Sequence, residues 1–190
     1  MSVKNIYIDD SNLAIGGTKL HNRLAATTCV DWSYDITELN RIIMKQCGFN
    51  IFGARRFYVY GANLRRNDQL NHFRAENVVY GYDCPRNSRG REKEADVTLA
   101  IDMTAHAKIW SDAGMPCDIV LVSGDGDFFP AAVKALELGS NVHIWSWRSS
   151  LSQSFRRLEE HLENRPLYGV GQIRIHELDT WLDQLTRSPM

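Results

Sequence analysis

The sequence predicts an α/β fold, namely a three-layer α/β/α sandwich with a mainly parallel sheet of about five strands. Two observations carry this prediction. Short runs rich in β-branched and aromatic residues alternate with segments of helical periodicity, and parallel strands need such helices as crossovers. The chain of 190 residues, 44% apolar and 24% charged, is also typical of one soluble globular domain. The longest apolar runs are only about five residues, far too short for a membrane span.

Five apolar runs are predicted as strands because they are short, rich in β-formers and bounded by polar or turn-forming residues. They are residues 3–8, 56–60, 77–82, 118–122 and 141–147. The tail adds one short alternating run at 172–175.

Helical periodicity marks the segments between these runs. Leu39, Ile42, Ile43 and Cys47 share one face of a helix predicted over 37–47. The other predicted helices cover 92–110, 130–138, 152–162 and, in the tail, 177–185. Residues 16–34 and 83–91 are predicted as loops because they are rich in Gly, Asn, Thr, Pro or Ser. We therefore expect one domain over 1–162 and a C-terminal extension over 163–190 that packs on the domain or on a partner.

Charge and cysteine content exclude some classes of protein. The net charge of −1 does not by itself demand a polyanionic partner. The start of the chain lacks the long apolar core of a signal peptide. The four cysteines lie far apart, and no short-spaced Cys/His set indicates a structural zinc site. Reduced thiols and a cytoplasmic location are the expectation.

Acidic residues follow two of the predicted strands, at the point where each strand ends. The first strand is followed by Asp-Asp-Ser-Asn at 9–12, and the fourth by Ser-Gly-Asp-Gly-Asp at 123–127. The long helix before the fourth strand carries Asp96 near its start. The carboxyl ends of parallel strands lie along one edge of a sheet, so we expect Asp9, Asp96, Asp125 and Asp127 to converge there.

Converging carboxylates repel one another unless a cation lies between them. Oxygen-only ligands select hard divalent ions, so the expected cofactor is Mg²⁺ or Mn²⁺. Such ions bridge carboxylates to phosphate oxygens and can activate water. The alternative for each single residue is a helix cap or a turn. Asp102 falls on a different helical face from Asp96 and is expected to have a supporting role.

Three motifs resemble those of the NYN domains, a group of PIN-like, metal-dependent ribonucleases that includes LabA-like proteins. The first is the strand followed by residues 9–12, with Asp10 in the place of the usual glycine. The second runs Lys-Glu-Ala-Asp-Val at 93–97, with Glu94 in the place of glycine. The third, Ser-Gly-Asp-Gly-Asp-Phe-Phe-Pro at 123–130, matches in full. The resemblance covers about residues 3–160.

The resemblance implies a PIN-like fold and hydrolysis of RNA phosphodiester bonds with Mg²⁺ or Mn²⁺. It implies that Asp9, Asp96, Asp125 and Asp127 hold the metal. It also implies that Asn12 and Ser123 orient the metal ligands or a phosphate.

A chain of net charge −1 needs local cations to hold RNA. The candidates are arginines and a lysine expected near the acidic edge, namely Arg65, Arg86, Arg89, Arg91, Lys93 and Arg148. Tyr60, Tyr82 and Trp147 near strand ends could stack on the exposed bases of single-stranded RNA. Each of these residues has a plainer alternative as a solvated surface charge or a packing aromatic.

The leading interpretation is therefore a metal-dependent endoribonuclease. A second is an RNA- or protein-binding module that keeps the fold without turnover, and a homo-oligomer or a larger complex stays open as the assembly. A phosphatase is disfavoured because the first strand is not followed by Asp-x-Asp. No Walker-type or Gly-x-Gly-x-x-Gly loop indicates nucleotide binding.

Overall fold

The computed structural model describes residues 3–26, 32–49, 55–84, 94–115 and 117–187. In these ranges a six-stranded sheet runs through the molecule, with every strand parallel to its neighbours. The strands are β1 (Val3–Asp9), β2 (Arg55–Gly61), β3 (Val79–Asp83), β4 (Cys117–Val122), β5 (Asn141–Ser146) and β6 (Ile173–Glu177). The α/β fold and its parallel sheet are confirmed, and the run predicted at 172–175 provides the sixth strand.

The strand order is β3-β2-β1-β4-β5-β6. β2 and β3 therefore extend the sheet on one side of β1. The chain then crosses to the other side, where β4, β5 and β6 follow in order. The position between β1 and β4 is the switch point, where the loops that follow adjacent strands diverge to opposite faces and leave room for a ligand. β1 and β4 are also buried along nearly their whole length, as expected for central strands of a parallel sheet.

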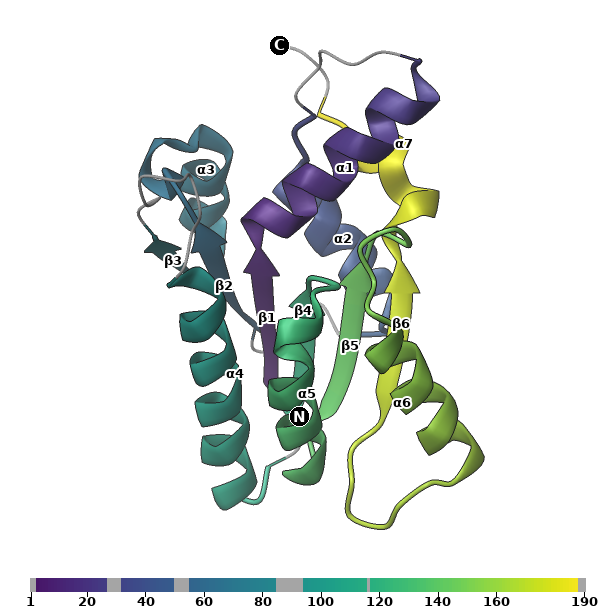
Figure 1. Cartoon of the computed structure of the whole chain (residues 1–190). Coiled ribbons are helices and arrows are strands. Elements are labelled where there is room, and N and C mark those ends of the chain that lie inside the picture. Colours follow the sequence, from purple (N-terminus) through teal and green to yellow (C-terminus); the bar gives the residue numbers. More distant parts are fainter. Residues whose placement is uncertain (1–2, 27–31, 50–54, 85–93, 116, 188–190) are drawn as a thin grey trace.

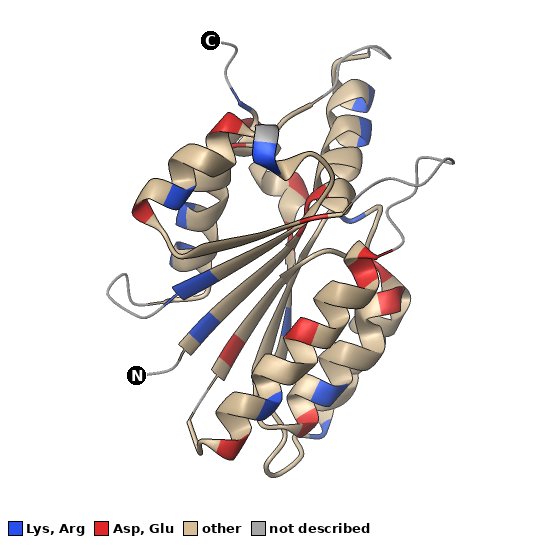
Figure 2. Ribbon diagram, turned by 90° about the vertical axis from the view of Figure 1, so that its left-hand side faces the viewer, with Lys and Arg blue, Asp and Glu red and all other residues tan. Residues whose placement is uncertain are grey.

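Helices cover both faces of the sheet (Figures 1 and 2). One face packs against α1 (Asp10–Leu24), α2 (Ile36–Gln46), α3 (Asp68–Glu76) and the short α7 (Leu182–Leu185). The other packs against α4 (Ala95–Asp112), α5 (Phe129–Glu137) and α6 (Gln153–Asn164). Three 3₁₀ turns, Leu64–Arg66, Gly126–Phe128 and Leu178–Trp181, connect these elements. The three layers agree with the predicted sandwich.

Helix α1 corrects the prediction of a loop at 16–34, which was wrong up to Leu24. Gly16 and Gly17 lower the intrinsic helix propensity of this segment, but they let two tryptophans approach the helix backbone. A Cβ atom on Gly16 would stand 2.1 Å from Trp147, and one on Gly17 would stand 2.2 Å from Trp32. The Trp147 indole also donates to the Leu13 carbonyl at 2.9 Å. Tertiary packing therefore outweighs local propensity here.

The C-terminal segment adds an edge strand to the sheet. β6 pairs with β5, from Val142 opposite Ile173 to Ser146 opposite Glu177. The helix predicted over 177–185 is shorter than expected, because Glu177 ends β6 and a 3₁₀ turn precedes α7. Beyond α7, Thr186 forms a bridge with Tyr34 and accepts a hydrogen bond from the Trp32 indole at 2.8 Å.

Candidate metal and nucleic-acid site

Asp9 ends β1 and caps α1 at the switch point of the sheet. Its Oδ1 accepts hydrogen bonds from the Asn12 backbone N–H at 3.0 Å and from the Ser11 hydroxyl at 2.9 Å. Its Oδ2 accepts from the Ser123 hydroxyl at 3.1 Å, across from the end of β4. A carboxylate offers about four lone-pair directions, so three hydrogen bonds leave roughly one, on Oδ2, for a cation. The side chain is buried, which holds it in this orientation.

The segment after β4 carries the second group of predicted ligands. Ser123 is buried, and its hydroxyl also accepts a hydrogen bond from the Asp125 N–H at 3.3 Å. Asp125 caps the turn Gly126–Phe128 by accepting from the Asp127 N–H at 3.0 Å through Oδ1. Asp127 itself is exposed. Asp125 therefore caps a turn, which was the alternative to metal binding for each acidic residue. This hydrogen bond uses Oδ1 and still leaves Oδ2 available to a cation.

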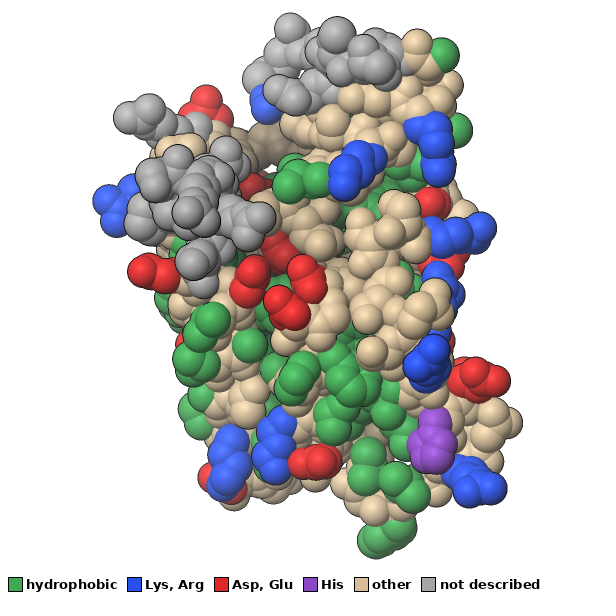
Figure 3. All heavy atoms as spheres, viewed as in Figure 1, with side chains coloured by type: hydrophobic (Ala, Val, Ile, Leu, Met, Phe, Trp, Pro, Cys, Tyr) green, Lys and Arg blue, Asp and Glu red, His purple; other side chains and the backbone are tan. Residues whose placement is uncertain are grey.

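Asp96 lies on a third segment, and among the described residues no three carboxylates come within 4.8 Å of one another. It lies half-buried in the first turn of α4, and α4 packs against the turn Gly126–Phe128. Figure 3 shows acidic side chains gathered between the upper ends of α4 and α5, where β4 also ends. Asn12 lies in the first turn of α1, where its backbone N–H orients Asp9.

The electrostatics of Asp9 fit a cation site. Burial raises the pKa of this carboxyl above its ordinary value, and the nearby charge of Asp125 raises it further. The three hydrogen bonds lower the pKa and only partly offset burial. A buried carboxylate beside a second carboxylate is unfavourable when ionised alone, and a hard divalent ion would relieve both costs.

Gly124 has a packing role. Its carbonyl accepts from the Ser152 N–H at 2.9 Å, and a Cβ atom there would stand 2.1 Å from Ser146 Oγ and 2.7 Å from the Ser150 carbonyl. The glycine thus lets the end of β4 press against the turn between β5 and α6. This contact explains the glycine.

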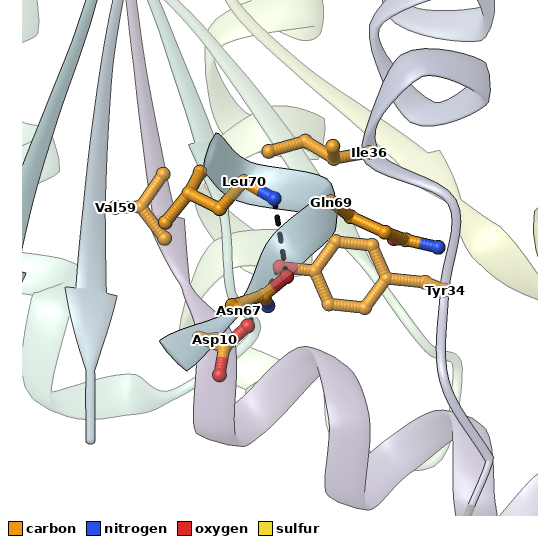
Figure 4. Close-up of a pocket in the computed structure, with 7 residues that line it drawn as sticks. All are labelled: Asp10, Tyr34, Ile36, Val59, Asn67, Gln69 and Leu70. Atoms are coloured by element: carbon orange, nitrogen blue, oxygen red, sulfur yellow. Dashed lines mark hydrogen bonds between the residues drawn. The ribbon is translucent and has the colours of Figure 1, made fainter. Parts of the chain in front are cut away.

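Asp10, which replaces the glycine usual in the first motif, is tied to a neighbouring segment. The Tyr34 hydroxyl donates to its Oδ1 at 2.7 Å. Both residues line a small pocket beside the start of α3, where Asn67 caps the helix by accepting from the Leu70 N–H at 3.1 Å (Figure 4). The charge of Asp10, and more weakly that of Asp9, raises the pKa of the buried Tyr34, and burial raises it most. Asp10 therefore joins a hydrogen-bonded network next to the Asp9 site.

The structure describes two of the six predicted RNA-binding residues. Arg65 is exposed in the turn after β2. Arg148 is exposed too, but its guanidinium donates to Glu177 at 2.7 and 3.0 Å, and its N–H donates to Asp179 at 2.7 Å. The remaining four candidates, Arg86, Arg89, Arg91 and Lys93, lie outside the described residues.

The aromatic candidates are mostly packing residues. Trp147 is fully buried against α1, and Tyr60 is buried and stacked on Tyr82 with ring centroids 4.7 Å apart. The suggestion that Tyr60 and Trp147 stack on bases is therefore wrong, because their faces are covered. Tyr60 on β2 donates to Asp102 on α4 at 2.7 Å, which gives Asp102 the supporting role that was predicted.

The described helices include none with the length and apolar character needed to cross a membrane. In a comparison with known families, the model described as the NYN domain matches residues 4–163. Comparison with curated proteins gave no match, and comparison with solved structures gave none either. NYN domains fall within the PIN-like nuclease superfamily and are generally nucleases. The match confirms the resemblance found in the three motifs, and the chain belongs to the NYN domain family.

Proposed function

We propose that this protein is an endoribonuclease that uses Mg²⁺ or Mn²⁺. The observation that carries the proposal is the link between Asp9 and Asp125 across the switch point, in which the Ser123 hydroxyl donates to Asp9 and accepts from the Asp125 N–H. Family membership supports a nuclease role.

In this proposal Asp9, Asp96, Asp125 and Asp127 supply hard oxygen ligands from three segments of the chain. The ion would neutralise a phosphate and lower the pKa of a water molecule that attacks it. Ser123 and the Asn12 backbone fix the direction of the Asp9 carboxylate. A preorganised carboxylate needs little rearrangement during the reaction, which is the usual source of electrostatic catalysis.

RNA is proposed to approach along the edge formed by the carboxyl ends of the strands. Arg65 lies at that edge, and we include Arg86, Arg89, Arg91 and Lys93 from their place in the sequence before Asp96. Arg148 is a weaker candidate because Glu177 and Asp179 already engage it. We propose single-stranded RNA, because side chains cannot reach the bases in the deep, narrow major groove of an RNA duplex, whereas unpaired bases are accessible.

The test is cleavage of labelled single-stranded RNA with Mn²⁺, with and without a chelator. Asp125→Asn should lower the rate on the order of 10³-fold, because it removes a charged group from the reacting site. Asp112→Asn is the matched control, since Asp112 is exposed at the opposite end of α4 from Asp96. RNA binding without cleavage by the wild-type protein would instead favour a binding module.

A further inference from the structure

Three metal-binding side chains meet on the sheet face that is covered by α2. Cys47 follows the last residue of α2, His143 lies on β5 and His176 lies on β6. We call them the Cys–His group. Their donor atoms, one sulfur and two imidazole nitrogens, all lie within 4.8 Å of one another. Cys47 and His143 are 96 residues apart and His143 and His176 are 33 apart, so no short spacing in the sequence indicates a metal site.

The distances in this group resemble those around a bound zinc ion. Cys47 Sγ is 3.5 Å from His143 Nδ1, and His143 Nδ1 is 3.1 Å from His176 Nε2. In a tetrahedral zinc site the sulfur–nitrogen separation is roughly 3.5 Å and the nitrogen–nitrogen separation roughly 3.3 Å, given the usual bond lengths. Two of the three separations therefore already suit one ion, and the third, which is at most 4.8 Å, would need to shorten by about 1.3 Å at most.

Neighbouring residues hold the group in place. Gly48, with a φ of +64°, ends α2 and turns the chain so that the Phe49 ring packs edge-on against His143 at 5.4 Å. The Trp145 ring stacks on His176 at 4.4 Å with an interplanar angle of 7°. The buried Trp145 indole nitrogen has no hydrogen bond of ordinary geometry to the described residues. Its N–H nevertheless lowers the pKa of the Cys47 thiol, because it favours the thiolate.

The protonation of the group suits metal binding in part. Burial lowers the pKa of both histidines, that of His176 to about 4, so both rings are neutral at pH 7, the form that binds metal. Burial raises the pKa of Cys47 to about 12, so an ion would have to displace the thiol proton. The charged side chains that act on the group are Asp118 and Arg174. Lys4 pairs with Asp118 at 3.4 Å and lies over the Phe49 ring.

The donor set also separates this group from the acidic site. Sulfur and imidazole ligands select borderline ions such as Zn²⁺ and disfavour Mg²⁺. His143 is buried, whereas Cys47 and His176 are partly exposed, so solvent can supply a fourth ligand. The group lies on the α2 face of β5 and β6, whereas Asp9 and Asp125 lie beyond the ends of β1 and β4.

We propose that Cys47, His143 and His176 form a second metal site, one that binds Zn²⁺ or a similar borderline transition-metal ion. Bound there, the ion would join α2 to β5 and to the edge strand β6. It would thus fasten the C-terminal segment to the rest of the domain. The inference does not depend on ribonuclease activity.

The test uses the metal-stripped full chain and Co²⁺ as a spectroscopic substitute for zinc. Supporting results are a sulfur-to-cobalt charge-transfer band that saturates at one ion per chain, and displacement of the band by Zn²⁺ but not by excess Mg²⁺. Cys47→Ser should abolish the band, and His176→Gln should weaken binding on the order of 10²-fold. His161→Gln, at an exposed position of α6, and Asp125→Asn should both keep the band. The last variant separates this site from the proposed catalytic one.

Two measurements on the wild-type protein keep the test decisive if a variant fails to fold. Zn²⁺ at a hundred times its dissociation constant should raise the melting temperature by about 5–10 °C. Zn²⁺ should also protect Cys47 from alkylation, as read by peptide mass spectrometry. No charge-transfer band at saturating Co²⁺, a band that survives in Cys47→Ser, or unprotected Cys47 would each overturn the proposal. The three side chains would then be a hydrogen-bonded packing cluster.

Discussion

Replacing Asp9 should separate the stability of the fold from the chemistry of the site. Asp9→Asn keeps the shape of the side chain. Its Oδ1 can still accept from the Asn12 N–H and the Ser11 hydroxyl, and its amide can donate to the Ser123 hydroxyl. We therefore expect the free energy of unfolding to change by less than about 1 kcal/mol. The proposed ribonuclease activity should nevertheless be lost, because the charge is gone.

Asp9→Ala is the informative comparison. It removes the cap of α1, which costs about 1 kcal/mol, and leaves the buried Ser123 hydroxyl without this acceptor, which costs about 1–3 kcal/mol. The sum of about 2–4 kcal/mol should lower the melting temperature by about 4–15 °C in a chain of this size. Thermal unfolding in metal-free buffer, followed by circular dichroism, measures both variants side by side.

The pH dependence supplies a second readout. The pKa of Asp9 is raised in the folded state, so the folded protein binds more protons at this position than the unfolded chain does. The wild-type protein should therefore lose stability as the pH rises from the ordinary pKa of an aspartate to the raised one. Asp9→Asn lacks this loss, so its stability relative to wild type should improve across the same window. Equal destabilisation by Asn and Ala, or a stability difference between Asp9→Asn and wild type that stays constant with pH, would refute this account of a strained buried charge.

Three further predictions follow from single contacts. Gly16→Ala should lower the free energy of unfolding by about 1–3 kcal/mol in calorimetry, because its Cβ would stand 2.1 Å from Trp147; an unchanged or higher melting temperature would mean that helix propensity prevails. Tyr60→Phe should cost about 1.5–3 kcal/mol in urea unfolding by removing the hydrogen bond to Asp102, whereas Tyr168→Phe at an exposed position should change nothing. Hydrogen bonds from Arg148 and Arg156 lower the pKa of Glu177, so this carboxyl should titrate below 4.5 by NMR, and Arg148→Ala should raise its pKa. Any stability that these ion pairs give is present above the ordinary pKa of a glutamate, and it is lost as the pH falls through the lowered pKa of Glu177.

The parts of the site that the sequence predicted share one property. Asp9 is the last residue of β1 and Asp125 follows the end of β4 by three residues, so the end of an apolar run locates both along the chain. Parallel strands then bring their carboxyl ends to one edge. Helical periodicity similarly located α4 near Asp96, and among the described residues α4 begins at Ala95. Of the predicted helix, Glu92 and Lys93 lie outside the described residues.

The predictions that failed were local readings that distant contacts overrode. Gly16 and Gly17 read as loop residues, yet they lie in a helix because two tryptophans from residues 32 and 147 pack on them. Tyr60 and Trp147 read as exposed aromatics at strand ends, yet other parts of the chain cover them. A short stretch of sequence does not predict which distant side chain will pack against it.

By itself the sequence determined the layered α/β architecture and the acidic ends of two strands, since periodicity and strand termini are properties of neighbouring residues. Only the tertiary structure decided the strand order and the tie between Tyr34 and Asp10. It alone brought Cys47 to His143 and His176. Such meetings depend on how whole helices pack across a sheet, which is set by the burial of apolar surface throughout the chain rather than by any short motif.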